Sequence, residues 1–252
     1  GGGSAGGVGG GSAGGGGGGG GGGTGGGAQT GGWRWENPTP AGGNLTTAVW
    51  GTGPNDVWVV GDNGTVVRWN GSSWTGLFTE REFLLGISGS GPNDVWVWAQ
   101  SSDPLMGLIP HTLHWNGTSW VRMSGITNPW CSGPTDAWAP GAAGTAMRWN
   151  GTTWASVPNG SSNYVSRYWG AGPSDVWGVG GAGTVVHWNG SAWSSITSGT
   201  TSALTDVWGS GPSDIWAVGV GGTTIHWSGS AWATVASGTT NDVTDIWGSG
   251  PT

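Results

Sequence analysis

Five aspartates and five basic side chains recur along the chain in a pattern that could suggest a carboxylate set or a metal site. The basic residues are histidine or arginine, and histidine with carboxylate is a common zinc ligand set. Each residue, however, appears once per repeat of ~39 residues, so repetition spreads the set over separate units, too far apart for a coordination shell of ~2 Å. We therefore predict turn aspartates and polar pairing, with no metal and no cofactor. The residues are Asp56, Asp94, Asp136, Asp175 and Asp214, and Arg68, His114, Arg148, His187 and His226.

The repeat is measured by a Gly-Pro-x-Asp motif. Its prolines are 38, 42, 39, 39 and 39 residues apart. Each unit holds four short runs rich in Val, Ile, Thr or Trp, bounded by Gly, Pro, Asn or Ser, which is typical of four-stranded propeller blades. In one unit we expect strands a to d at 204–208, 214–219, 223–227 and 232–236. The sequence predicts an all-β propeller with five complete blades. The prolines are Pro54, Pro92, Pro134, Pro173, Pro212 and Pro251.

Two kinds of turn separate these strands. In the Gly-Pro-x-Asp turn, proline fixes φ and aspartate can bond to neighbouring backbone amides. Asn-Gly pairs, as at Asn70 and Asn189, suit a tight hairpin between strands c and d. These pairs also match a glycosylation sequon, but their recurrence favours a turn role.

Most of the 23 tryptophans keep register with the motif. One tryptophan lies four residues before the proline and another four residues after it. A large aromatic side chain at a fixed blade position can pack one blade on the next, burying about 200 Å² each. Ser88 replaces the first tryptophan in its blade, which gains Trp98, so we expect the volumes to compensate. We assign structural roles to Trp50, Trp58, Trp138, Trp169, Trp177, Trp208 and Trp216.

Composition limits the partners of the chain. The net charge of −7 and the charged fraction of 8% argue against nucleic acid or an anionic membrane as partner, because both need a basic face. Cys131 is the single cysteine, so an internal disulfide is impossible. It occupies a position that is glycine in other repeats and is interpreted as a tolerated small residue. No apolar run is long enough for a membrane helix.

The two ends of the chain differ from the repeats. Residues 1–32 are mostly glycine and are expected to form a disordered linker or tether. Residues 33–252 form the predicted propeller, with an isolated d strand at 33–36. Residues 242–252 begin a further unit with strand a, so we expect a parent protein of six to eight blades, truncated here at its C-terminus.

The repeats resemble the blades of Asp-box (BNR), sialidase-like propellers, and most of all the branch that includes the photosystem II assembly-factor propellers. The resemblance rests on Gly-x-x-Gly-Thr, a short strand and a Gly-x-x-Trp hairpin, as in Gly61–Trp74 and Gly180–Trp193. It departs from the family because tryptophan replaces the Asp-box aspartate. The Trp-x-Trp-x-Asn-Pro segment at 33–38 resembles bacterial surface or secreted proteins, which implies an extracellular, cell-surface or periplasmic location, with a lipoprotein anchor as an option.

The resemblance to sialidases implies an arginine triad, a tyrosine nucleophile and acidic partners. Tyr164, Tyr168, Arg167, Glu80 and Glu82 are of these types but lack matching spacing, so we do not predict an enzyme. Function is instead expected where the repeat is broken. In a meander of four strands, the b–c and d–a connections lie on the same face. The candidate rim site comprises Glu80, Arg81, Glu82, Asp103, His111, Tyr164, Arg167 and Tyr168, where replacing Arg81 and Tyr168 by alanine should abolish binding without loss of stability.

Two functions remain open alongside a less favoured glycosidase. The first is a monomeric, non-enzymatic surface or secreted scaffold that binds a protein or a cell-envelope component. The second is a lectin whose tryptophans stack on sugar rings, with equivalent sites in several blades. The lectin requires exposed hairpin tryptophans, whereas the scaffold requires buried ones, so exposure of Trp69, Trp188 and Trp193 distinguishes them.

Overall fold

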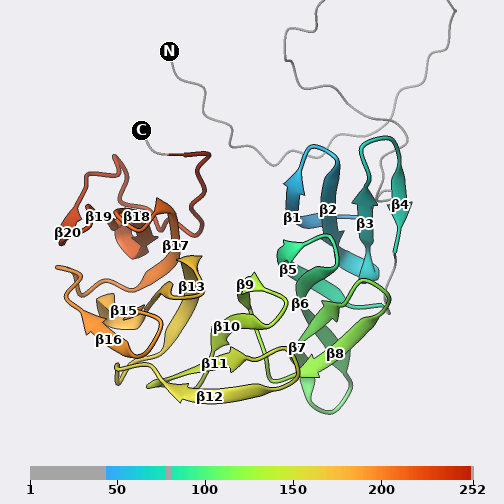
Figure 1. The fold of residues 1–252 in the computed structure, drawn as a ribbon, viewed down its shortest axis with the longest axis horizontal. Coiled ribbons are helices and arrows are strands. Elements are labelled where there is room, and N and C mark those ends of the chain that lie inside the picture. The colour runs from blue at the N-terminus through green and yellow to red at the C-terminus, as the bar shows by residue number, and fades with distance from the viewer. Residues whose placement is uncertain (1–43, 78–80, 251–252) are drawn as a thin grey trace, which may run out of the picture. The chain divides into compact units, whose positions relative to one another are not determined.

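The computed structural model describes residues 44–77 and 81–250. The predicted linker at 1–32 and the predicted strand at 33–36 lie outside the described residues. Five four-stranded antiparallel sheets follow one another along the chain, each in the order a-b-c-d (Figure 1), which confirms the all-β fold and the five blades. Among the described residues, no helix has the length and apolar character needed to cross a membrane.

The first two blades contain β1 (Thr46–Gly53), β2 (Asp56–Gly61), β3 (Val66–Trp69), β4 (Trp74–Gly76), β5 (Phe83–Gly91), β6 (Asp94–Asp103), β7 (Gly107–Trp115) and β8 (Trp120–Ser124). The third contains β9 (Trp130–Gly133), β10 (Asp136–Pro140), β11 (Thr145–Trp149) and β12 (Trp154–Pro158). The fourth and fifth contain β13 (Val165–Gly172), β14 (Asp175–Gly180), β15 (Val185–Trp188), β16 (Trp193–Ile196), β17 (Leu204–Gly211), β18 (Asp214–Gly219), β19 (Thr224–Trp227) and β20 (Trp232–Thr234).

Strand β19 begins one residue later than expected, at Thr224, and three further departures are larger. Strand β17 runs three residues past Trp208, because its pairing with β18 continues through an irregularity to Gly211 and Asp214. Strand β20 ends at Thr234, earlier than predicted. Residues 242–250 are not a strand, although we expected strand a there. The segment still bonds to the fifth blade, where Ile246 N donates to Asp206 Oδ2 at 2.9 Å and Val243 N donates to Gly219 O at 3.1 Å.

The c–d hairpins show why Asn-Gly recurs. Asn70 Oδ1 accepts the backbone N–H groups of Ser72 and Ser73, each at 2.9 Å, which closes the turn through the side chain. Gly71 follows with φ of +93°, a conformation that favours glycine. The positive φ of the glycine is as predicted. The asparagine contributes its side-chain oxygen as the acceptor that closes the turn.

Tryptophans join consecutive blades in one repeated geometry. The ring of the strand-b tryptophan packs on the two hairpin tryptophans of the next blade. Trp138, for example, is fully buried, with its ring centroid 5.1 Å from that of Trp188 and 5.0 Å from that of Trp193. The same contacts join Trp58 to Trp115 and Trp120, Trp96 to Trp149 and Trp154, and Trp177 to Trp227 and Trp232.

Strand-a tryptophans make a second contact between blades, and it explains the single cysteine. A Cβ built on Gly170 would lie 2.6 Å from the Trp130 ring of the preceding blade and 2.6 Å from Asp175 O of its own blade, so the ring is one of the two groups that a side chain there would displace. The same relation holds between Trp169 and Gly209. In the second blade, Ser88 occupies the position of the strand-a tryptophan. At the facing position in the third blade, Cys131 occurs where the other blades have glycine. Loss of the indole ring therefore leaves space that the buried Cys131 side chain occupies.

Trp98 lies beside the same gap. It pairs with Gly86 across β5 and β6, and it lines a cavity of about 30 Å³ together with Ser88 and Trp96. The Trp98 ring therefore fills part of the volume left by the missing tryptophan, as expected from the exchange of Ser88 for Trp98 within one blade.

Candidate functional site

The repeated aspartates bind within their own blades. Asp94 Oδ1 accepts the Trp96 indole N–H at 3.0 Å and contacts His114 Nε2 at 2.7 Å, while the Ser90 hydroxyl donates to Oδ2. The imidazole also stacks on the indole of Trp96, with centroids 3.7 Å apart. Each aspartate thus holds the a–b turn and strand c together in one blade.

The other blades vary this network. His187 and His226 contact Asp175 and Asp214, whereas Arg68 and Arg148 donate to Asp56 and Asp136. The Ser210 hydroxyl, followed by His226, lowers the pKa of Asp214. Within the described parts of the chain, no group of three His, Cys, Asp or Glu side chains could hold a metal ion.

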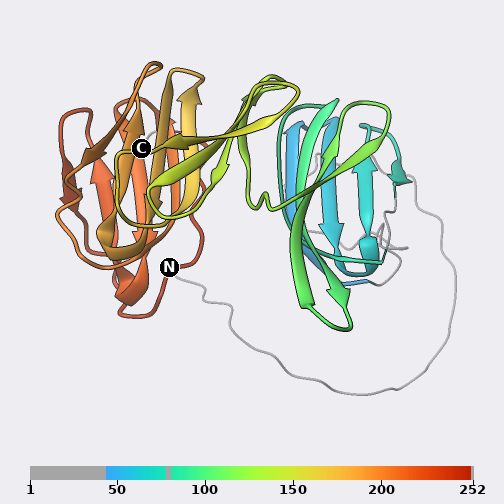
Figure 2. The same cartoon turned by 90° about the horizontal axis from the view of Figure 1, so that it is seen from below.

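The largest departure from the repeat is the hairpin of β6 and β7. Its pairing continues from Ser101 and Ile109 to Asp103 and Gly107, and the extra length reaches past the first blade in Figure 2, where it is green. At the tip, Asp103 Oδ1 accepts the backbone N–H groups of Leu105 and Met106, each at 2.8 Å. These two bonds hold the pKa of Asp103 below its ordinary value.

This turn presents apolar side chains to solvent. Leu105 is 96% exposed, Met106 78% and Leu108 56%. We call these three residues the hairpin tip. A cluster of exposed apolar side chains is typical of a surface that contacts another molecule. The hydrogen-bonded turn holds these side chains toward solvent.

A buried polar cluster supports the base of the hairpin. Glu82, which precedes β5, contacts His111 Nε2 through Oε2 at 3.1 Å and accepts from Arg122 Nη1 through Oε1 at 2.6 Å. Arg122 Nη2 also donates to Ser101 Oγ at 2.7 Å. Because His111 and Glu82 are buried, their polar atoms depend on these partners. The cluster ties the d–a connection, both hairpin strands and β8 together.

Both ring nitrogens of His111 make polar contacts. Nε2 lies 3.1 Å from Glu82 Oε2, and Nδ1 lies 3.2 Å from both Ile109 O and Arg122 Nη2. The ring is thus held between β7, the residue before β5, and β8.

The structure brings some predicted rim residues together and separates others. Glu82 and His111 meet in the cluster, Asp103 shapes the tip and Arg81 is exposed. Glu80 lies outside the described residues. The b–c turns and d–a connections do share one face, since Gly64 N donates to Glu82 O at 2.9 Å.

Arg122 is a cluster member that our reasoning from the sequence missed. A signal was present, because the equivalent position holds a small residue in the other blades. A long cation in place of these residues breaks the repeat as clearly as the inserted hairpin does. The small residues are Gly76, Ser156, Ser195 and Thr234.

Arg167 and Tyr168, two of the predicted rim residues, lie on strand β13 of the fourth blade, where Arg167 is half-buried and Tyr168 is buried. Tyr168 is only 5% exposed, and its ring lies 5.6 Å from that of Trp193. Burial raises the pKa of its hydroxyl well above the ordinary range. The expectation that Tyr168→Ala would leave stability unchanged is therefore wrong, since the substitution would open a cavity. Of the three predicted rim residues before and in β13, which are Tyr164, Arg167 and Tyr168, Tyr164 is the exposed one.

Arg167 on β13 contacts polar side chains from the blades on both sides, Asn128 before β9 and Asp206 on β17. Its Nε lies 3.9 Å from Asp206 Oδ1, and its guanidinium lies against the side-chain amide of Asn128. Burial raises the pKa of Asp206, and the charge of Asp245 adds to this effect, while hydrogen bonds from the N–H groups of Ile246 and Val207 oppose it.

Replacement of Asp206 by asparagine should change the pH dependence of stability. The folded protein holds the Asp206 proton to a higher pH than the unfolded chain does, so this carboxyl lowers the free energy of unfolding as pH rises above 3.8 through the raised pKa. The free energy of unfolding of Asp206→Asn should therefore increase relative to that of the parent as the pH rises from 3.8 through the raised pKa of Asp206, as measured by urea unfolding. A difference independent of pH would contradict this expectation.

Comparison with known proteins gives a fold and no family. No family of sequences matches the chain, and no curated protein matches it. Among solved structures, YCF48 from Cyanidioschyzon merolae is 14% identical, with a TM-score of 0.53, covering 84% of this chain and 92% of that one. The RRP9 WD40 repeats and U3-55K are each 11% identical with a TM-score of 0.57. They are covered over 61% and 62% of their lengths, against 75% of this chain. At such identities the likeness is one of fold: the chain is a β-propeller with distant structural similarity to YCF48 and to WD40 propellers.

Proposed function

We propose that this propeller is a non-enzymatic binding scaffold that contacts a protein partner through the hairpin tip of the second blade. The observation that carries the proposal is the exposure of Leu105, Met106 and Leu108 on a turn fixed by Asp103. A rigid apolar projection needs little ordering on binding, and its burial in a groove of the partner would supply affinity. The proposed setting is the bacterial cell surface or periplasm, or the secreted state, as for the Trp-rich bacterial proteins that the segment at 33–38 resembles.

The tryptophans give less support to a lectin that stacks sugars on indole rings. Trp188 is buried, and Trp193 is half-buried against Trp138. Trp69 is half-buried and lies 5.6 Å from Trp74 between ring centroids. Trp188 and Trp193 pack on the preceding blade and have no free face for a sugar. Within the described residues, Trp69 and Trp74 of the first blade are not among the rings that join blades.

A site-specific crosslinking experiment tests the proposal. A photoreactive amino acid at position 105 should form a discrete protein adduct in cells that produce the full chain, whereas the same group at exposed Val220 should not. The partner identified from that adduct should then bind Met106→Asp at least about tenfold more weakly than the parent, because buried apolar anchors dominate interface energy. The matched control is Val220→Asp, which places the same charge on another connection. Equal affinity of both variants would refute the proposal.

A further inference from the structure

The fourth and fifth blades each carry a groove, and the two grooves are lined by residues at equivalent positions of the repeat. The blade 4 groove has a volume of about 810 Å³ and the blade 5 groove about 680 Å³. Both volumes fall within the range of about 300–1,000 Å³ that is usual for small-molecule sites. Each is formed by the turn between strands b and c, the end of strand d and the connection that follows it.

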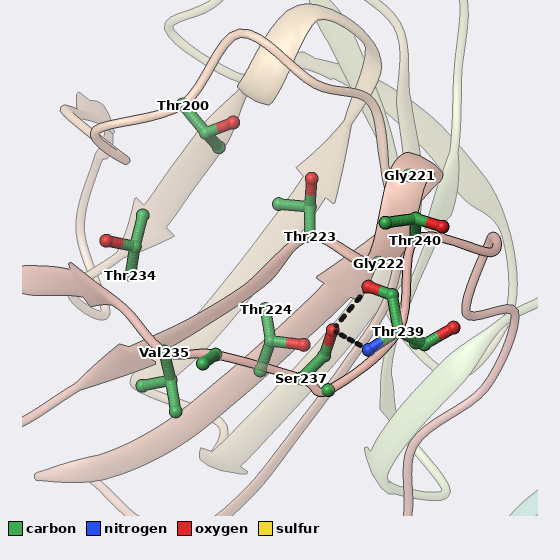
Figure 3. A pocket seen from close by; sticks show the side chains of 12 residues that line it. Thr200, Gly221, Gly222, Thr223, Thr224, Thr234, Val235, Ser237, Thr239 and Thr240 are labelled. Atoms are coloured by element: carbon green, nitrogen blue, oxygen red, sulfur yellow. Dashed lines mark hydrogen bonds between the residues drawn. The ribbon is translucent and has the colours of Figure 1, made fainter.

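The corresponding side chains are 39 residues apart. Ser195 and Thr234 occupy one position, Ile196 and Val235 the next, and Ser198 and Ser237 a third. Figure 3 shows the blade 5 groove, in which Ser237 and Thr239 lie opposite Thr200 from the preceding connection. The grooves are thus two versions of one site.

Backbone geometry fixes the shape of both grooves. Ser237 Oγ accepts Thr239 N at 3.3 Å and donates to Thr239 O at 3.1 Å, and Ser198 makes the same two bonds with Thr200. The glycine between them has φ of +77° or +78°. A hydrogen-bonded turn of this kind holds its hydroxyl groups in place before any ligand arrives.

The linings carry no charge. Apart from Asn163, the polar side chains are serine and threonine. The hydroxyls of Ser198, Ser237 and Thr223 donate to backbone carbonyls, and a serine or threonine hydroxyl without such a bond can both donate to and accept from a ligand.

Ile196 and Val235 add an aliphatic patch to each groove. Phosphate, carboxylate and metal ions would find no counter-charge here, whereas neutral sugars offer hydroxyl groups together with apolar C–H faces. We propose that the two grooves bind neutral oligosaccharides, a site separate from the hairpin tip.

The two grooves also meet. Thr200 lines both of them, so the two grooves are adjacent and a linear oligosaccharide could extend from one to the other. A chain that reaches both grooves should bind more tightly than a short one, because the second contact becomes intramolecular.

The second blade provides a natural counterpart. Arg122 occupies the position of Ser195 and Thr234, and it turns to Glu82 and Ser101. Arginine is therefore compatible with this strand position in the fold. An arginine placed at Ser195 or Thr234 should fill the groove with a long charged side chain while the blade remains intact.

Binding stoichiometry tests the assignment. The probes are cellotriose, maltotriose and chitotriose with the full chain, with trigalacturonic acid as the charged comparison. Saturation-transfer NMR and calorimetry should detect one neutral sugar at about two equivalent sites of about millimolar affinity, and its hexamer should bind about tenfold or more tightly. Ser195→Arg or Thr234→Arg should each remove one site, and the double variant both.

The control variant is Ala233→Arg, which places the same charge on the neighbouring exposed residue outside the groove and should retain both sites. Far-UV circular dichroism verifies that each variant is folded. Absence of binding by all neutral probes would overturn the inference, and so would binding that persists in the double variant. Neither outcome affects the crosslinking result at position 105, so the two proposals can fail separately.

Discussion

Replacing Trp138 by alanine should lower the free energy of unfolding by about 3–5 kcal/mol, the cost usual for removing a fully buried large aromatic side chain. The ring lies between two hairpin tryptophans of the fourth blade and under the Arg148 guanidinium, whose Cζ is 4.9 Å from the ring centroid. Its loss would leave a cavity between two blades that rigid strands cannot close. Urea unfolding followed by far-UV circular dichroism measures the change.

Trp216 provides a matched control at the equivalent position of the fifth blade. It is only half-buried, and within 44–77 and 81–250 its ring stacks on His226 at 4.2 Å without a following tryptophan pair. Trp216→Ala should therefore cost about 1–2 kcal/mol, well below the cost at Trp138. Equal costs at both positions would show that packing between blades is not the source of the stability.

Replacing Glu82 by alanine should destabilise the protein by about 2–4 kcal/mol, because His111 would lose its carboxylate inside the fold and Arg122 would lose its ion pair. The Gly64 N–H would keep its partner, since it bonds to the Glu82 backbone. Glu82→Gln should cost less, as the amide oxygen still accepts one hydrogen bond. Arg81→Ala removes an exposed neighbouring charge and should have little effect.

Hydrogen exchange should localise the loss caused by Glu82→Ala. Amides in the outer part of β6 and β7 should exchange faster, while those of β17 and β18 should not change, because the side-chain hydrogen bonds of the cluster described above lie in the second blade. A uniform increase over all blades would mean that the cluster has no special role in holding the hairpin.

The repeat made the fold readable from the sequence, because each tryptophan, aspartate and Asn-Gly pair was repeated at an equivalent position. Strand ends were less predictable: β17 extends through an irregular pairing, and residues 242–250 lack the partner strand that a sheet requires. The hairpin insertion was visible as an excess of residues. The burial of Tyr168 was not, because a tyrosine next to an arginine is equally compatible with a rim or a core position.

The cluster and the grooves depend on pairings that only three dimensions reveal. Glu82 and Arg122 are 40 residues apart, and the contact follows from the way β8 returns beside the connection before β5. Grooves lined by serine and threonine resemble ordinary turn composition in the sequence. Cys131 was interpreted as a tolerated small residue, and the absence of an indole at Ser88 supplies the reason.

Because successive junctions between blades use the same tryptophan contacts, one unit presents the surface that the next unit requires. A duplicated segment of 39 residues would carry both complementary faces and could be inserted in frame without new partners for its side chains. Unequal recombination within such a gene would therefore change the number of blades while preserving each junction. Propeller size in this lineage can thus evolve through copy number rather than through the redesign of any interface.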